Sequence, residues 1–284
     1  MPAQPRLPIA MKILTDIHTH TTFSADGIDD IWTMLAQAKA LGLTYWGISE
    51  HFDYDYKVNG ITYEGTPIAY TDSQSYFAAA RLLQSQTSLP HILVGCEFGF
   101  TDNPNVFPLY DDIIEKYEPD FIVNSVHTQG MSDYYELEAF GNLDKQTSYG
   151  YYLGLIRKSL DAPYRYDIVG HIGYVCRKAP YADRVMHYSE FPEQLDDILA
   201  TIIKKDKILE VNSSVKGLDT PFLPFPEIVG RYYQLGGRMI SFASDAHNAA
   251  RLADGRETAM QTLQSIGFTH LTIPCHGKKT YVPI

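Results

Sequence analysis

The chain has 284 residues, of which 45% are apolar, and its formal net charge at pH 7 is -11. This acidic balance argues against a nucleic-acid-binding surface, which requires clustered basic side chains. No apolar stretch approaches the roughly 18 residues of a membrane span, and the first residues lack the pattern of a secretory signal. The three cysteines, Cys96, Cys176 and Cys275, form no Cys-x-x-Cys pair. We therefore expect a cytoplasmic protein with reduced thiols and without nucleic-acid or membrane partners, and composition leaves its oligomeric state open.

Apolar runs typical of buried strands alternate with amphipathic segments typical of helices along the chain. Strands are predicted at 11–17, 43–51, 91–98, 120–127, 166–175, 207–214 and 238–247, with a final short run at 270–275. Helices are predicted at 27–42, 71–86, 108–117, 144–160, 193–205, 225–237 and 256–267. This alternation indicates an α/β fold with a parallel sheet covered by helices. Seven or eight such units favour a single-domain barrel over residues 12–284 rather than an open doubly wound sheet, preceded by a flexible extension at residues 1–11.

The segment DIHTHTTFSADG, residues 16–27, gathers several groups that can hold a metal. Side chains alternate along a strand, so Asp16, His18 and His20 are expected to share one face. Taken alone, the His-x-His pair is compatible with a polar strand end as well as with a metal chelate. The ends of the other strands have to decide between these two interpretations.

Ligand-type side chains stand at the carboxyl ends of six predicted strands. They are His18 with His20, His51, Glu97, His127, His171, and Asp245 with His247. In a (β/α) barrel these ends meet at one mouth, where catalytic groups converge. The sequence therefore predicts a metal centre at that mouth. The four remaining histidines begin strands or lie in loops and are assigned no role, namely His91, His187, His270 and His276.

Imidazole and carboxylate ligands without a thiolate suit zinc, manganese or iron. With Asp26 included, the set has nine residues, which suffice for three divalent ions if Glu97 bridges two of them. Two ions about 3.5–4 Å apart can hold a hydroxide between them and clamp the oxygens of a phosphoryl group. This donor set therefore predicts hydrolysis of an anionic ester.

Six motifs resemble those of the PHP (polymerase and histidinol phosphatase) superfamily from about residue 12 to the C-terminus. They are DIHTHTTFSADG, GISEH, GCEFGF, NSVH, GHIG and SFASDAH. EVNSSVKG and the ending KKTYVPI are most similar to the monofunctional histidinol-phosphate phosphatases. The resemblance implies a distorted TIM-like barrel of seven βα units and a trinuclear metal centre. It also implies hydrolysis of L-histidinol phosphate to L-histidinol and phosphate, in histidine biosynthesis, by attack of a metal-bridging hydroxide.

The resemblance further implies how the ligands divide among the ions. The first ion would be bound by His18, His20, Glu97 and Asp245, the second by Glu97, His127 and His171, and the third by Asp26, His51 and His247. Among these residues, Glu97, Asp245 and His247 would be catalytic. The carboxylates of Asp16 and Glu50 would orient the adjacent histidines.

A phosphate dianion also needs a fixed cation. Arg177, six residues after His171, is the first candidate, because a guanidinium group can bind two phosphate oxygens at once. Lys216 is the second candidate, and either residue could instead be an ordinary surface charge. The tyrosine-rich segment 52–70 could contact the rest of the substrate or be a plain surface loop.

Other functions stay open at this point. The same centre could act on another small phosphoester, such as a nucleotide, a sugar phosphate or a phosphotyrosine peptide. A degenerate barrel that serves as a binding module should have lost ligands, whereas every expected position is filled. A binuclear amidohydrolase also begins with His-x-His, but it would not need the further ligands in SEH and SDAH.

Overall fold

The computed structural model describes residues 14–63 and 66–284. Among these residues, seven parallel strands form one sheet in the order β1-β2-β5-β6-β9-β10-β11. The strands are β1 (Thr15–Asp16), β2 (Tyr45–Phe52), β5 (His91–Gly99), β6 (Ile122–Ser125), β9 (Ile168–Val169), β10 (Ile208–Asn212) and β11 (Ile240–Ala243). The predicted extension at residues 1–11 lies outside the described residues.

The first and last strands of this order also meet. The backbone N–H of Ile17 donates to the carbonyl of Phe242 (3.1 Å), and that of His20 donates to the carbonyl of Ala246 (2.8 Å). These bonds bring the sheet to a nearly closed barrel of seven βα units. The predicted (β/α)7 barrel is thereby confirmed over the open doubly wound sheet.

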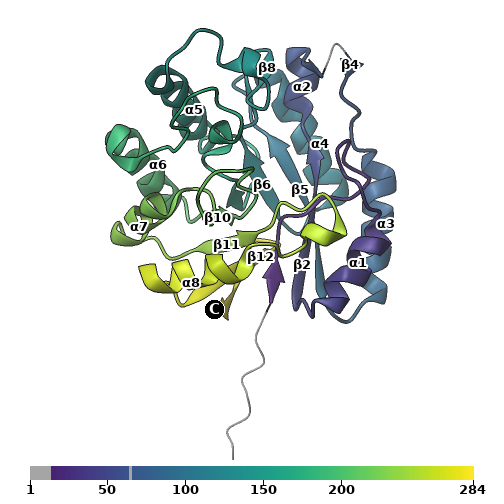
Figure 1. Cartoon of the computed structure of the whole chain (residues 1–284). Coiled ribbons are helices and arrows are strands. Elements are labelled where there is room, and N and C mark those ends of the chain that lie inside the picture. Colours follow the sequence, from purple (N-terminus) through teal and green to yellow (C-terminus); the bar gives the residue numbers. More distant parts are fainter. Residues whose placement is uncertain (1–13, 64–65) are drawn as a thin grey trace, which may run out of the picture.

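Helices surround this barrel on its outer side, except α2 (Tyr54–Asn59), which lies at the end toward which the strands point (Figure 1). In the described part of the chain they are α1 (Ile31–Ala40), α2 (Tyr54–Asn59), α3 (Ser73–Gln86), α4 (Phe107–Tyr117), α5 (Lys145–Ser159), α6 (Pro192–Lys204), α7 (Pro226–Gln234) and α8 (Arg256–Ile266). Short 3₁₀ turns are η1 (Pro104–Val106), η2 (Leu137–Ala139), η3 (Tyr174–Arg177), η4 (Tyr188–Glu190) and η5 (Ala249–Arg251). In α3, the buried residues Tyr76, Phe77, Ala80 and Leu83 follow the helical period, so one stripe of the helix packs on the sheet.

Aspartates define the starts of three of these helices. Asp30, Asp72 and Asp144 precede α1, α3 and α5, and each side chain accepts hydrogen bonds from backbone N–H groups of the first turn. Such a cap satisfies donors that the helix itself leaves unpaired. The local sequence therefore fixes where these helices begin.

Smaller elements lie outside the barrel. Two short hairpins, β3 (Thr62–Tyr63) with β4 (Thr66–Pro67) and β7 (Thr128–Gln129) with β8 (Ser132–Asp133), follow the carboxyl ends of β2 and β6. In Figure 1, α2 and β8 lie at the end of the barrel toward which the strands point. The final apolar run does not join the barrel, because β12 (His270–Cys275) pairs antiparallel with β13 (Lys278–Pro283).

Candidate metal centre

Glu97 occupies the middle of the predicted centre. Its side chain is 1% exposed, and its two oxygens face different imidazoles. Oε1 lies 2.9 Å from His171 Nε2 and 3.2 Å from His127 Nε2. Oε2 lies 3.2 Å from His18 Nε2 and 2.9 Å from His51 Nδ1. One carboxylate thus touches histidines that come from four different strands or strand ends.

The first expected ligand group is brought together around His20. The Nε2 atoms of His18 and His20 lie 3.0 Å apart, and Asp245 Oδ1 lies 3.4 Å from His20 Nε2. All three side chains are buried. The chain turns at Asp245, whose backbone φ of 52° is unusual for a residue other than glycine. This turn after β11 places its carboxylate beside the two histidines that follow β1.

The second and third expected groups are also assembled. His127 Nε2 and His171 Nε2 lie 3.3 Å apart, beside Glu97. At the outer edge, Asp26 Oδ2 lies 2.9 Å from His247 Nε2, and Asp26 Oδ1 lies 3.8 Å from His51 Nε2. The Asp26 side chain is 61% exposed, so this third group borders solvent.

The buried carboxylates and imidazoles of the centre shift one another's pKa values. Burial disfavours the charged form of Glu97, but His18, His127 and His51 together hold the pKa of its carboxyl well below the usual range. Burial and the neighbouring His51 and other imidazoles lower the pKa of His20 to about 3. Burial opposes the charge on His18, His51 and His127, but the neighbouring carboxylates raise the pKa of all three imidazoles well above the usual range. The ionised Glu97 and the neutral His20 have the protonation states that a divalent metal requires, and metal binding at the other three rings would displace protons.

Buried nitrogen atoms without a hydrogen-bond partner also indicate a metal site. Among the described residues, His51 Nδ1 and His247 Nε2 are buried without a hydrogen-bond partner, although each has a carboxylate oxygen within 3.0 Å. The Nε2 atoms of His18 and His20 also face each other at 3.0 Å, and those of His127 and His171 face each other at 3.3 Å. A cation between such groups would satisfy them together. The donor set and its geometry therefore fit divalent metal ions.

Two carboxylates that touch these histidines were not predicted from the sequence. Glu210 of β10 accepts a hydrogen bond from His18 Nδ1 (2.6 Å) through one oxygen and from the backbone N–H of His171 (2.8 Å) through the other. Asp53, just after β2, accepts a hydrogen bond from His127 Nδ1 (3.2 Å). The signal for Glu210 was available, because it is an acidic residue in the middle of the apolar run ILEVN. Nothing comparable marks Asp53, which stands in a polar loop.

Asp16 and Glu50 accept hydrogen bonds from the loops that carry the ligands, and Glu50 reaches His20 through the Ser24 hydroxyl, which lies 3.3 Å from His20 Nδ1. Asp16 accepts hydrogen bonds from the backbone N–H (2.9 Å) and hydroxyl (2.6 Å) of Ser244. It therefore fixes the loop that carries Asp245. Glu50 accepts from the hydroxyls of Thr21 (2.6 Å) and Ser24 (2.5 Å) and so fixes the loop after β1.

The two candidate phosphate-binding cations differ in burial. Arg177 is 4% exposed, and its Nη2 lies 3.0 Å from Asp245 Oδ2 and 3.1 Å from Asn212 Oδ1. Its Nε is buried without a hydrogen-bond partner in the described part of the chain. Lys216 is exposed in the loop after β10, at a backbone φ of 47°. Arg177 is therefore beside the ligand groups, whereas Lys216 is at the solvent side.

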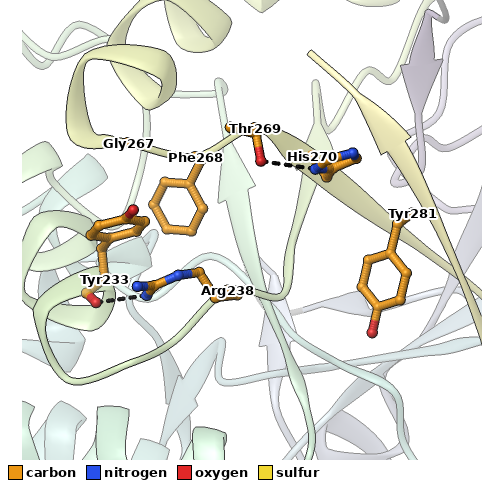
Figure 2. A pocket seen from close by; sticks show the side chains of 7 residues that line it. All are labelled: Tyr233, Arg238, Gly267, Phe268, Thr269, His270 and Tyr281. Atoms are coloured by element: carbon orange, nitrogen blue, oxygen red, sulfur yellow. Dashed lines mark hydrogen bonds between the residues drawn. The ribbon is translucent and has the colours of Figure 1, made fainter.

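Two other features lie away from this centre. Asp120, Cys275 and His276 come close together, but the Asp120 oxygens already accept from Arg81 (2.6 Å) and Gln84 (2.7 Å). A cavity of about 420 Å³ is lined by Tyr233, Arg238, Gly267, Phe268, Thr269, His270 and Tyr281. Figure 2 shows that Arg238 donates a hydrogen bond to the backbone carbonyl of Tyr233 beside this cavity. The cavity lies near the starts of β11 and β12. Neither feature contains a predicted site residue.

A family model and individual proteins both match most of this chain. The model of the family described as PHP domain matches residues 16–214. The chain is 28% identical over 237 residues to a protein of Clostridium acetobutylicum named "Probable histidinol-phosphatase", covering 82% of this chain and 86% of that protein. It is 27% identical over 264 residues to the histidinol-phosphatase of Lactococcus lactis, covering 90% of this chain and 92% of that protein.

A solved structure is also similar over nearly the whole chain. It is the histidinol phosphate phosphatase of Lactococcus lactis in complex with zinc, L-histidinol and phosphate. The TM-score is 0.83 at 25% identity, and the match covers 95% of this chain and all of that one. In the residues that the structure describes, no helix has both the length and the apolar character needed to cross a membrane.

Proposed function

This chain belongs to the PHP domain family of metal-dependent phosphoesterases, and we propose that it hydrolyses L-histidinol phosphate to L-histidinol and phosphate. The observation that carries the hydrolytic part is Glu97, whose two oxygens face imidazoles of different ligand groups. The substrate is supported by the similarity, over most of its length, to a histidinol phosphate phosphatase with L-histidinol and phosphate bound. This substrate places the enzyme in histidine biosynthesis.

We propose that the ligands divide as the family resemblance implies. His18, His20, Glu97 and Asp245 would hold the first ion, Glu97, His127 and His171 the second, and Asp26, His51 and His247 the third. Zinc, manganese and iron all suit these donors. Bound there, such ions would supply an acidified water and neutralise charge on the phosphoryl group.

The protein's own residues would divide the remaining work. Glu97 would fix the distance between the first and second ligand groups. Asp245 and His247 lie where the first and third groups meet. Burial opposes the charge on Asp245, but Arg177 beside it holds the pKa of this carboxyl well below its usual range, so Asp245 stays ionised. These three residues are the proposed catalytic set.

Arg177 is the proposed phosphate-binding cation, with Lys216 as a weaker second contact. The Nε of Arg177 is buried without a hydrogen-bond partner in the described part of the chain, and Nη2 of the same group contacts Asp245, so we propose that a phosphate oxygen at the centre accepts from Nε. A charge-assisted contact in such a partly dry place is stronger than one in water. Lys216 is exposed and would contribute mainly a positive electrostatic potential that attracts the phosphate to the mouth of the barrel.

The test is a steady-state comparison of substrates with the metal-loaded enzyme. We expect kcat/KM for L-histidinol phosphate to exceed that for nucleotides, sugar phosphates, a phosphotyrosine peptide and p-nitrophenyl phosphate by at least about a hundredfold. Preference for another member of the panel would keep the phosphoesterase and replace the substrate. Absence of hydrolysis with all substrates, at full metal content, would contradict the proposal altogether.

A further inference from the structure

Asp53 lies between two histidines that belong to different ligand groups. Its Oδ1 is 3.2 Å from His127 Nδ1 and accepts a hydrogen bond from it. Its Oδ2 is 3.0 Å from His51 Nδ1. The side chain is 14% exposed, so both contacts are largely shielded from water. Asp53 is not one of the nine ligands proposed above.

Asp53 stands where other aspartates of this chain cap a helix, but its side chain makes no such cap. Asp53 is the residue directly before α2. Asp30, Asp72 and Asp144 occupy the same position before their helices and cap them. Among the described residues, Asp53 alone of these four aspartates makes no side-chain hydrogen bond to its helix. An aspartate at this position that does not cap its helix has its carboxylate held by another interaction. Here the imidazoles of His127 and His51 are what its carboxylate contacts.

The neighbouring strand leaves room for this carboxylate. A Cβ atom at Gly99, the last residue of β5, would lie 2.7 Å from Asp53 Oδ1 and 2.3 Å from Asp55 Oδ1. A side chain at position 99 would therefore force both carboxylates to move from these positions. The glycine therefore allows both acidic side chains to fold back over the end of β5, toward the centre.

We propose that Asp53 is a positioning residue of the metal centre. It orients the His127 and His51 rings and so fixes the position of the second ligand group relative to the third. At His127, where Asp53 accepts from Nδ1–H, such a bond fixes the tautomer of the ring and leaves Nε2 as the metal-binding atom. At His51, Asp53 acts through its charge, because Nδ1 lies 3.0 Å from Asp53 and 2.9 Å from Glu97 without a hydrogen bond to either. In His127 this Nε2 lies 3.2 Å from Glu97 and 3.3 Å from His171. In His51, Nε2 faces the exposed Asp26.

Asp55 provides a matched control from the same segment. It lies two residues further on, is fully buried, and accepts a hydrogen bond from the Thr128 hydroxyl (2.9 Å). Asp53→Asn and Asp55→Asn each replace a carboxylate that is largely shielded from water by an amide of the same size. An amide at position 53 can still accept the hydrogen bond from His127 but has lost the negative charge that faces His51, whereas Asp53→Ala removes both contacts.

The experiment measures zinc affinity by competition with a chromogenic chelator, without substrate. We expect Asp53→Asn to lower the apparent affinity for zinc by roughly 10- to 100-fold and Asp53→Ala to lower it at least as much. Asp55→Asn should stay within about twofold of the wild type. At saturating zinc, all variants should bind the wild-type number of ions, because no ligand has been removed. Cobalt-substituted Asp53→Asn should show an altered visible spectrum, and its kcat should fall more than its KM rises.

The outcomes separate this proposal from its alternatives. Wild-type zinc affinity and an unchanged cobalt spectrum in Asp53→Ala would overturn it. Loss of one ion at saturating zinc would also overturn it, because Asp53 would then be a ligand. The inference rests on the metal centre of the proposed function and not on the identity of the substrate. A failure to hydrolyse L-histidinol phosphate would therefore leave the zinc measurements interpretable.

Discussion

At the scale of single residues, Glu97 differs from every histidine around it because its two oxygens face separate ligand groups. We predict that Glu97→Gln lowers kcat by about a thousandfold or more, since an amide cannot carry the charge that two cations share. Steady-state kinetics and circular dichroism check this result, with the barrel expected to stay folded. The exposed Glu115→Gln on α4 is the control and should keep wild-type kcat. Near-normal turnover with full metal content in Glu97→Gln would show that Glu97 is not a bridge.

Arg177 and Lys216 can be separated by their effects on substrate use. We predict that Arg177→Ala lowers kcat/KM for the preferred phosphoester by roughly ten- to hundredfold, the effect of losing a charge-assisted contact worth about 1.5–3 kcal/mol. Lys216→Ala should reduce it less, because this side chain is exposed. Kinetics are measured at saturating metal, since Arg177 also contacts Asp245 (3.0 Å). A large effect at Lys216 with none at Arg177 would reverse the assignment.

Asp55 makes stability depend on pH. Burial raises the pKa of its carboxyl to about 7, whereas the unfolded chain loses this proton near pH 4. The folded state therefore binds more protons than the unfolded state between these values, and stability falls as the pH rises from 4 to 7. Asp55→Asn cannot ionise, so we predict that at pH 8 its free energy of unfolding exceeds that of the wild type by roughly 1–3 kcal/mol. At pH 5 the gap should be smaller. Urea unfolding at both pH values checks this, and an equal gap would contradict it.

At the scale of elements, local sequence was sufficient wherever one periodic pattern decided the structure. The helix at α3 was predictable because its buried residues follow the helical period and Asp72 caps it. The run 270–275 resembles a barrel strand, yet it forms a hairpin with β13. The turn at His276 and Gly277, both with positive φ, allows this tight reversal. An apolar run alone does not say whether its partner is a parallel neighbour or the next few residues.

The packing of β1 on β2 gives a prediction about these two strands. A Cβ atom at Gly47, in β2, would lie 2.2 Å from the carbonyl oxygen of Ile17. We predict that Gly47→Ala destabilises the protein by about 1–3 kcal/mol or more, because the backbone of the adjacent segment cannot yield easily. The same substitution at Gly154, inside α5, meets no atom within 4 Å and should stabilise the helix by up to about 1 kcal/mol. Thermal unfolding of both variants checks this, and equal midpoints would contradict it.

At the scale of the whole molecule, the candidate site was more predictable than many local details. Parallel strands bring their carboxyl ends to one mouth, so residues far apart in sequence, such as His18 and Asp245, could be grouped before any distance was known. The contacts of Glu210 and Asp53 could not be predicted in this way. They depend on which side chains reach across the barrel, and that follows from strand tilt and loop geometry. The roles of the nine ligands with their ions stay predictions that metal binding has to test.

Metal binding joins the ends of six strands and should therefore stabilise the whole barrel. We predict close to three divalent ions per chain in protein purified without chelator, measured by elemental analysis. A single site held at 1,000 times its Kd stabilises the folded state by about 4 kcal/mol. For a chain of this size, chelation should then lower the thermal midpoint by at least roughly 8 °C, and added zinc or manganese should restore it. Calcium, which prefers oxygen ligands, is the control and should not restore it. A reproducible content of one ion or fewer, or a midpoint unaffected by chelator, would contradict a trinuclear centre.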